Sequence, residues 1–179
     1  MINSLTYSPA MIYNRRMETQ ERTPIPIINP IVAKELGTEN LGNIMKLNAA
    51  IQEEANRSRI ETHLLLIGGN VKPEKRGKFH KDVDLKLYSP QLATEVFTGG
   101  ESPKFDIFAS FINKIATTLN WKINVEKPWF HDYEFCSDGK VVLQTTGSPI
   151  EILPTREDSI KPSFKEFLDQ NADPHAVLH

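Results

Sequence analysis

The sequence predicts an α+β protein in which helices pack on one face of a mixed β-sheet. Residues 105–119 place large apolar side chains at steps of three and four, which is the period of an amphipathic helix. Residues 82–88 alternate strictly between polar and apolar side chains, which is the period of a strand with one buried face. Ser102 and Pro103 precede the helix as a cap and a first-turn proline, so we expect it to begin there.

The remaining elements follow in chain order. Residues 1–40 show no clean period and hold four of the 12 prolines, so we expect an extended N-terminal arm before a single domain over residues 41–179. Apolar residues recur on one helical face over 41–59. The pair Asp138-Gly139 predicts a β-hairpin, and Ser163 with Glu166 predicts a capping box before a short helix. The expected further strands cover residues 62–67, 121–125, 130–136, 140–146 and 150–153.

Composition limits the class of protein. The chain has 179 residues, 39% of them hydrophobic, and 21 basic against 23 acidic side chains give a formal net charge of −2. This excludes a uniformly basic nucleic-acid coat. Cys136 is the only cysteine, which excludes an intrachain disulfide. The longest aliphatic run, residues 64–67, is far too short to cross a membrane, so we expect a cytoplasmic protein without a membrane partner.

Three carboxylates are candidates for a metal site. Asp82 and Asp84 share one face of a predicted strand about 6.5–7 Å apart, and two such charges repel unless a cation lies between them. A divalent cation that prefers oxygen ligands, such as Mg²⁺, would bind such a pair of carboxylates. Glu151, between two isoleucines in a later strand, is the preferred third carboxylate. Asp132 and Glu134 on the predicted hairpin are the rival source of that third ligand.

A glycine pair and a basic loop precede these acids. Gly68 and Gly69 end a predicted strand, where backbone N–H groups can approach a phosphate closely. The segment between Gly69 and Asp82 has only Glu74 to oppose its five basic residues, which are Lys72, Lys75, Arg76, Lys78 and Lys81. A locally positive loop beside an acidic site suits a polyphosphate substrate that binds together with a metal ion.

In this order and spacing the motifs resemble the nucleotidyltransferase superfamily that includes DNA polymerase β. The resemblance rests on Ile67-Gly68-Gly69, Asp82-Val83-Asp84-Leu85 and Ile150-Glu151-Ile152. Two longer stretches resemble the head domain of CCA-adding tRNA nucleotidyltransferases and poly(A) polymerases more closely. These are Gly68-Gly69-Asn70-Val71-Lys72 and Glu151-Ile152-Leu153-Pro154-Thr155-Arg156. The likeness covers residues 64–156, roughly half of the chain.

The resemblance implies transfer of a nucleoside monophosphate from an NTP such as ATP to a hydroxyl acceptor, with release of pyrophosphate. It implies Mg²⁺, with Mn²⁺ as the alternative, on Asp82, Asp84 and Glu151. It also implies a set of nucleotide-binding residues, which are Gly68, Gly69, Lys72, Lys81 and Arg156. The sequence departs from the family at Lys72, where arginine is usual, and at Pro73, where an acid is common.

Several alternatives stay open at this point. The acceptor could be RNA, a protein or a small molecule, and a homodimer or a partner protein could complete the acceptor site. The main rival to an enzyme is an inactive nucleotidyltransferase-like module that binds nucleotide or a partner protein. A weaker rival is a metal-dependent hydrolase that uses the same acids.

Overall fold

The computed structural model describes residues 30–71, 81–96, 101–131, 134–171 and 176–178. A six-stranded sheet has the order β3-β6-β7-β2-β1-β8, and a two-stranded sheet pairs β4 with β5. The strands are β1 (His63–Leu66), β2 (Val83–Tyr88), β3 (Lys122–Glu126), β4 (Trp129–His131), β5 (Glu134–Ser137), β6 (Lys140–Gln144), β7 (Ile150–Pro154) and β8 (Ala176–Leu178). The helices are α1 (Pro30–Ser58), α2 (Pro103–Leu119) and α3 (Phe164–Gln170). The predicted α+β class is therefore confirmed.

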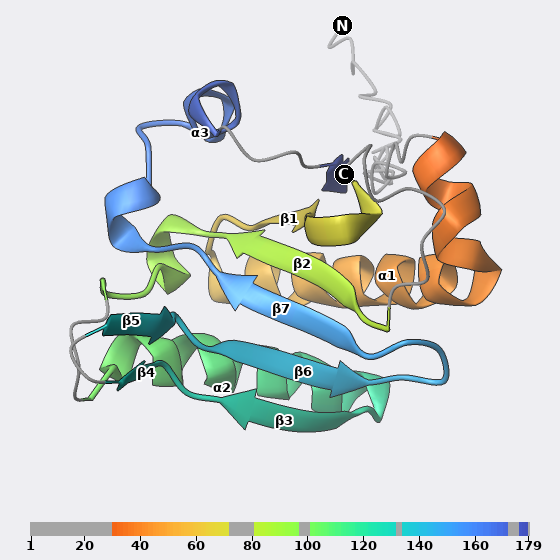
Figure 1. The fold of residues 1–179 in the computed structure, drawn as a ribbon, viewed down its shortest axis with the longest axis horizontal. Helices are drawn as coiled ribbons and strands as arrows, with labels where there is room; N and C mark the ends of the chain where they lie inside the picture. The colour runs from red at the N-terminus through yellow and green to blue at the C-terminus, as the bar shows by residue number, and fades with distance from the viewer. Residues whose placement is uncertain (1–29, 72–80, 97–100, 132–133, 172–175, 179) are drawn as a thin grey trace, which may run out of the picture.

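The large sheet is mixed because one of its strand pairs is parallel. β2 and β7 run in the same direction in the centre of the sheet, as their arrows show in Figure 1, while all other neighbours are antiparallel. Antiparallel neighbours can be joined by a short turn, whereas a parallel pair needs a long crossover. Here that crossover runs from β2 through α2 and then the strands β3 to β6 before the chain returns in β7.

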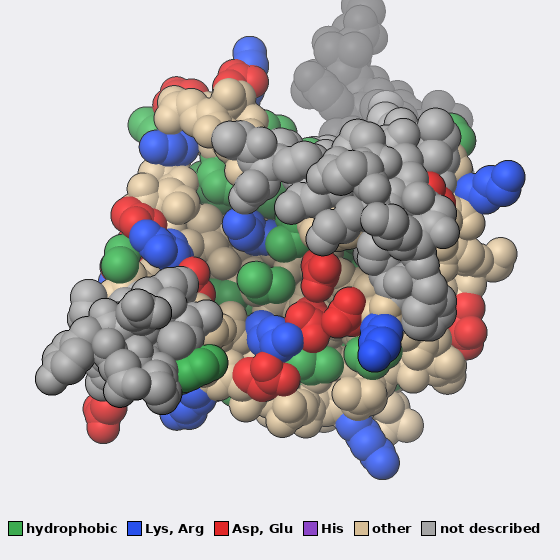
Figure 2. Space-filling view, in the orientation of Figure 1, with side chains coloured by type: hydrophobic (Ala, Val, Ile, Leu, Met, Phe, Trp, Pro, Cys, Tyr) green, Lys and Arg blue, Asp and Glu red, His purple; other side chains and the backbone are tan. Residues whose placement is uncertain are grey.

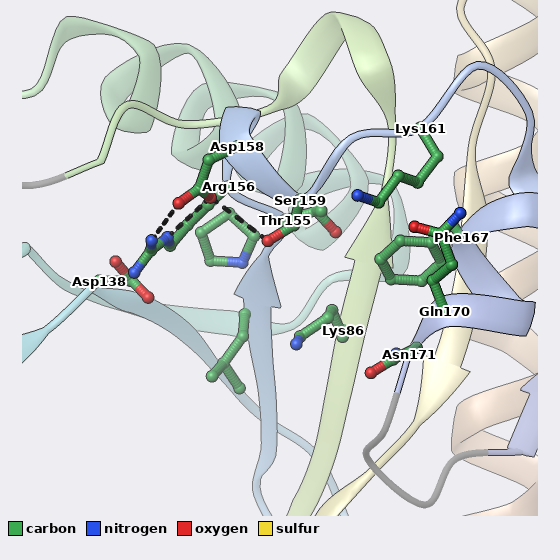
Figure 3. A pocket seen from close by; sticks show the side chains of 12 residues that line it. Lys86, Asp138, Thr155, Arg156, Asp158, Ser159, Lys161, Phe167, Gln170 and Asn171 are labelled. Carbon is green, nitrogen blue, oxygen red and sulfur yellow. Dashed lines mark hydrogen bonds and ion pairs between the residues drawn. The ribbon is translucent and has the colours of Figure 1, made fainter.

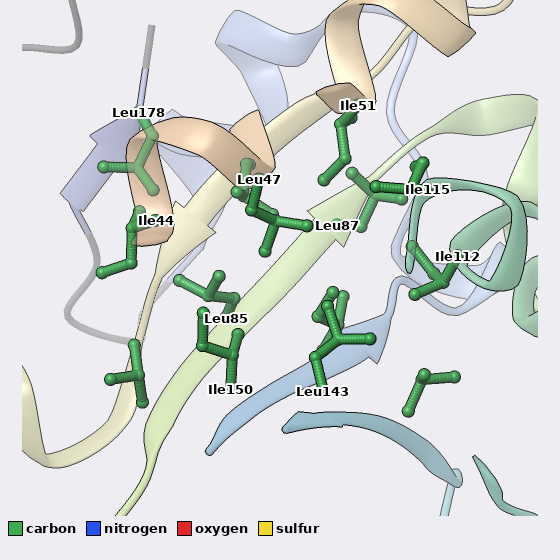
Figure 4. Packing of buried hydrophobic residues seen from close by; sticks show 14 of the residues in the cluster. Ile44, Leu47, Ile51, Leu85, Leu87, Ile112, Ile115, Leu143, Ile150 and Leu178 are labelled. Atoms are coloured by element: carbon green, nitrogen blue, oxygen red, sulfur yellow. The ribbon is translucent and has the colours of Figure 1, made fainter. Parts of the chain in front are cut away.

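The two long helices cover one face of this sheet (Figure 1). Alternate residues of β2 point toward them, and Leu85 and Leu87 are almost fully buried there against Leu47 of α1 and Ile112 of α2 (Figure 4). The short helix α3 packs on the opposite face, where Phe167 meets Leu65 and Tyr88. That second face otherwise carries the polar residues of β2, so the alternation predicted from the sequence positions the candidate site away from the main core.

The expected extended arm is wrong for residues 30–40, because α1 begins at Pro30. Val32 and Leu36 are buried against the core one helical turn apart. Gly37, with φ 75° and ψ 164°, then interrupts the helix with a kink. The change of direction at Gly37 breaks the period that the sequence would otherwise show. The rest of the expected arm, residues 1–29, lies outside the described residues.

The hairpin expected at Asp138-Gly139 is also wrong. The strands on either side of this turn do not pair with each other: β5 pairs with β4, and β6 pairs with β3 and β7. Gly139 adopts φ +81°, and a Cβ there would lie 2.7 Å from the side chains of Phe105 and Pro128. Glycine is therefore needed to let the chain cross between two sheets at close quarters.

Both predicted helix starts are found, although one is capped differently. At α3 the Ser163 hydroxyl accepts a hydrogen bond from the Glu166 backbone N–H at 3.2 Å, as a capping box requires. At α2 the Ser102 hydroxyl instead donates to Glu95 at 2.8 Å, and Glu95 accepts from the Lys104 backbone N–H at 3.1 Å. Among the helices of the described residues, none is long and apolar enough to cross a membrane.

Candidate metal and nucleotide site

Three carboxylates converge at the centre of the open face of the sheet. Asp82, Asp84 and Glu151 each offer one oxygen, and these oxygens all lie within 4.8 Å of one another. The convergence follows from the parallel pairing of β2 with β7, which sets Asp84 directly beside Glu151. All three residues are half-buried. Figure 2 shows acidic side chains gathered near the middle of this face, with basic side chains around them.

Buried neighbours hold the two aspartates in place. Val83, between them, is buried in the core, and its backbone N–H donates to the Pro149 carbonyl at 2.9 Å, just before β7. The turn that contains Pro149 is itself tied to α1. Asn40 accepts from the Ser148 N–H at 2.9 Å, and the Asn43 amide donates to the Thr145 hydroxyl at 3.1 Å. The acids are thus carried on strands whose ends are fixed by specific hydrogen bonds.

Gly68 packs directly against one of the acids. It follows β1 and opens a short 3₁₀ turn, with φ +72°. A Cβ at this position would lie 3.0 Å from Cβ and Cγ of Asp84, and closer still to its Oδ2. The preceding Ile67 N–H donates to the Asp84 carbonyl at 2.9 Å. Glycine is required here for two reasons: the left-handed backbone and the space taken by the Asp84 carboxylate.

A lysine that the sequence reasoning missed also belongs to this site. The Lys140 ammonium on β6 donates to Glu151 Oε1 at 2.7 Å and lies 3.5 Å from Glu126 Oε2. The hydrogen bond to Glu151 raises the pKa of Lys140, against the opposing effect of burial. Because β6 and β7 form an antiparallel pair joined by the Gly147-Ser148-Pro149 turn, counting back from that turn would have placed Lys140 near Glu151.

Of the other predicted nucleotide-binding residues, some lie next to the acids and others do not. Gly69 is buried in the turn after β1, and Lys81 is exposed immediately before Asp82. Lys72 lies outside the described residues, as do the other basic residues of the loop before Lys81. Arg156 follows β7, where it forms an ion pair with Asp158 rather than pointing at the acids. That interaction, a hydrogen bond with Asp158, raises the pKa of Arg156.

The rival third carboxylates are not part of this cluster as the structure describes it. Asp132 lies outside the described residues. The backbone of Glu134 belongs to β5, in the separate two-stranded sheet. Glu151 is therefore the acid that the structure brings to Asp82 and Asp84.

The residues present fit a divalent cation. Three carboxylate oxygens at mutual distances below 4.8 Å form a donor set of the hard type that Mg²⁺ and Mn²⁺ prefer. Like charges at this separation raise each other's free energy, and a cation between them removes that repulsion. In the structure the Lys140 ammonium supplies one positive charge to this cluster, on the Glu151 side.

Comparisons with known proteins give limited likeness. No family model and no curated protein matches the chain. Among solved structures, a tRNA nucleotidyltransferase complexed with a primer tRNA and an incoming ATP analog matches at 16% identity. This match covers 68% of this chain and 28% of that one, with a TM-score of 0.35. A tRNA-processing enzyme in an apo form matches at 15% identity over 79% of this chain and 33% of its own length, with a TM-score of 0.40.

The chain thus spans about a third or less of the length of these solved structures.

Proposed function

We propose that this protein is a metal-dependent nucleotidyltransferase that transfers a nucleoside monophosphate from an NTP to a hydroxyl acceptor and releases pyrophosphate. The observation that supports this most directly is the convergence of Asp82, Asp84 and Glu151 from two adjacent parallel strands. Gly68, packed against Asp84, adds a backbone turn that a phosphate group can approach closely. An acidic cluster beside the half-buried Gly68 suits a metal-bound polyphosphate.

Each residue has a stated role in this proposal. Asp82, Asp84 and Glu151 would hold Mg²⁺ or Mn²⁺, and the bound ions supply the charge that neutralises the phosphates and makes the acceptor hydroxyl more acidic. Gly68 and Gly69 would bind the triphosphate through backbone N–H groups. In the reaction the acceptor oxygen forms a bond to the α-phosphorus, the bond between that phosphorus and the bridging oxygen of pyrophosphate breaks, and the hydroxyl proton passes to solvent. The chain's task is to position these groups in line.

One observation favours the alternative of a module that binds nucleotide or a partner protein without catalysis. The Lys140 ammonium contacts Glu151 at 2.7 Å, so a side chain of the protein already neutralises the third carboxylate. A protein that has lost metal-dependent chemistry could keep its fold with such an internal cation. The two functions differ in whether pyrophosphate is released.

Calorimetric titration of the full chain with each of the four NTPs, in Mg²⁺ and in Mn²⁺, tests the proposal. We expect metal-dependent binding that is lost in the Asp82→Ala/Asp84→Ala double variant. The matched control, Glu35→Ala/Glu39→Ala, removes two carboxylates from exposed positions of α1 and should bind as the wild type does. Undiminished NTP binding in the Asp82/Asp84 variant would contradict the proposed site.

The NTP that binds is then incubated with RNA, protein and small-molecule acceptors while pyrophosphate is measured. Pyrophosphate release with a labelled acceptor supports the transferase. Binding without pyrophosphate release under either metal supports the binding module. Release of free monophosphate without a labelled acceptor would indicate a hydrolase instead.

A further inference from the structure

A pocket of about 350 Å³ lies on the same face of the sheet as the acidic cluster. Figure 3 shows the side chains that line it. Its floor is formed by β2 and β7, and its walls by the segment after β7 and by α3. We call it the β7–α3 pocket, and its lining includes Lys86, Asp138, Arg156, Lys161, Gln170 and Asn171. This volume is within the range of ordinary small-molecule sites.

The pocket continues directly from the acidic cluster. Lys86 follows Asp84 by two residues on the same face of β2, and Leu153 follows Glu151 by two residues on β7. Residues two apart on a strand are separated by about 6.5–7 Å, so the pocket begins about 7 Å from the acids. Gly68 packs against Asp84 near the other end of β2, because β1 is antiparallel to β2. A molecule in the pocket and a triphosphate over Gly68 would therefore approach the acids from opposite sides.

One end of the pocket carries excess positive charge. Lys86 and Lys161 both line it and are half-buried, and among the described residues neither forms an ion pair. Arg156 is the third cation, but its guanidinium is neutralised by Asp158. Gln170 and Asn171 also line the pocket (Figure 3). Half-buried charges gain most from a partner of opposite sign, and several oxygens of one phosphate can serve two lysines and an amide together.

The other end offers a hydrogen-bond acceptor. Oδ1 of Asp138 is buried and has no hydrogen-bond partner among the described residues. Burial raises the pKa of this carboxyl. The neighbouring Arg156 is held in place through its backbone, since Thr94 donates to the Thr155 carbonyl at 2.9 Å and accepts from the Glu157 N–H at 2.9 Å. A ligand that satisfied Asp138 would present a hydroxyl or amino group there.

We propose that the β7–α3 pocket binds a phosphate ester of the acceptor, with Lys86 and Lys161 contacting the phosphate and Asp138 accepting a hydrogen bond from the attached sugar or base. This inference rests on the proposed function, and it names the acceptor class: a phosphorylated molecule whose free hydroxyl lies within about 7 Å of its phosphate. A sugar phosphate and the phosphorylated end of a nucleic-acid strand share this chemistry.

Titrations without divalent metal, in EDTA, report on the pocket alone. The full chain is titrated with inorganic phosphate, ribose 5-phosphate and a 5′-phosphorylated oligonucleotide, with calorimetry as the readout. We expect Lys86→Met and Lys161→Met each to weaken binding about tenfold, as loss of one charge-assisted hydrogen bond predicts. The matched controls Lys122→Met on β3 and Lys165→Met on α3 remove exposed lysines elsewhere and should change binding less than about twofold.

The probes distinguish the two sources of the phosphate. Tighter binding of ribose 5-phosphate indicates a small acceptor, and tighter binding of the oligonucleotide indicates a strand end. Equal binding of all three probes to the wild type and both lysine variants would overturn the proposal. Urea unfolding of each variant checks that a loss of binding does not reflect a loss of folding.

A last titration separates this inference from the proposed function. Ribose 5-phosphate is added to protein saturated with Mg²⁺ and a non-hydrolysable analogue of the NTP that binds. We expect both ligands to bind together. Displacement of ribose 5-phosphate by the NTP analogue would show that the pocket belongs to the nucleotide, and would overturn the inference. If no NTP binds under any metal, the proposed function fails, whereas the metal-free titrations still decide whether the pocket binds phosphate.

Discussion

Replacing Gly68 by alanine should change both the stability of the fold and the affinity of the metal site, because the added Cβ has two separate effects. The residue has φ +72°, so any side chain meets the strain of the left-handed region. The new Cβ would also lie 3.0 Å from Cβ and Cγ of Asp84 and closer to its Oδ2, so the carboxylate must move. The first effect acts on stability, and the second acts on the position of a proposed metal ligand.

The size of each effect can be estimated separately. A non-glycine residue in the left-handed region costs about 1–2 kcal/mol. Forcing the Asp84 side chain off its preferred rotamer adds about 0.5–1.5 kcal/mol. The free energy of unfolding should therefore fall by about 1.5–3.5 kcal/mol. A displaced ligand should also weaken binding of Mn²⁺ by about 10–100-fold, the range seen when a group that orients a metal ligand is lost.

Two other glycines provide matched controls in α1. A Cβ on Gly42 would meet nothing within 4 Å, so Gly42→Ala should stabilise the helix by about 0.5–1 kcal/mol. Gly37 has φ +75° but equally open surroundings, so Gly37→Ala should lose stability without affecting Mn²⁺ affinity. Urea unfolding in EDTA measures the stabilities, and calorimetry measures the Mn²⁺ affinities. A Gly68→Ala protein that unfolds like Gly42→Ala and binds Mn²⁺ like the wild type would refute this reasoning.

Three further variants test particular contacts. Lys140→Met removes the ammonium from Glu151, so it should lower the unfolding free energy in EDTA by about 1–2 kcal/mol and tighten Mn²⁺ binding, measured by urea unfolding and calorimetry. Burial raises the pKa of Asp138, so its ionised form destabilises the folded state above that pKa. Asp138→Asn should therefore gain stability relative to the wild type as the pH rises from about 3 to 7, measured by urea unfolding at each pH. Glu95→Gln weakens the contacts at the start of α2 and should cost about 1 kcal/mol in urea unfolding.

Each of these variants has an exposed counterpart, namely Lys122→Met, Asp169→Asn and Glu101→Gln. The counterparts remove the same group where no comparable contact is made, and they should change stability by less than about 0.5 kcal/mol. Unchanged Mn²⁺ affinity in Lys140→Met would show that Lys140 does not compete for Glu151. A stability difference for Asp138→Asn that stays constant with pH, or equal unfolding of Glu95→Gln and Glu101→Gln, would likewise contradict the stated causes.

The hydrophobic periodicity of the sequence correctly predicted those helices and strands that have one face buried in the core. The apolar spacing of α2 and the alternation of β2 were both confirmed, and the second placed Asp82 and Asp84 on one face. Elements shaped by tertiary contacts were missed. The start of α1 is hidden by the kink at Gly37, and β8 is only three residues long and exists because it pairs with β1. A three-residue strand carries too little pattern for a sequence to predict.

The candidate site shows the same division. The order of the motifs predicted Glu151 as the third carboxylate. Its position beside Asp84, however, depends on a parallel pairing between two strands that are distant in sequence. The local sequence does not specify that register. Lys140 was missed for a different reason: it reaches Glu151 across the antiparallel pair of β6 and β7, and the register of that pair follows from the turn that joins them. Asp138-Gly139 was misread for a related reason. A turn dipeptide specifies the local backbone, whereas the sheet that each flanking strand joins is decided elsewhere in the chain.

The parallel pairing of β2 with β7 has a consequence for folding kinetics. β2 and β7 can pair only when the long segment between them brings their ends together, and closing a loop of this length costs conformational entropy. Pairings of such high contact order form late or limit the rate of folding. An ion held by all three acids would link these two distant segments in the native state. If the pairing forms after the folding transition state, the bound ion would mainly slow unfolding and leave the folding rate unchanged. The dependence of the unfolding rate on metal concentration would then show whether β2 and β7 separate before the transition state for unfolding.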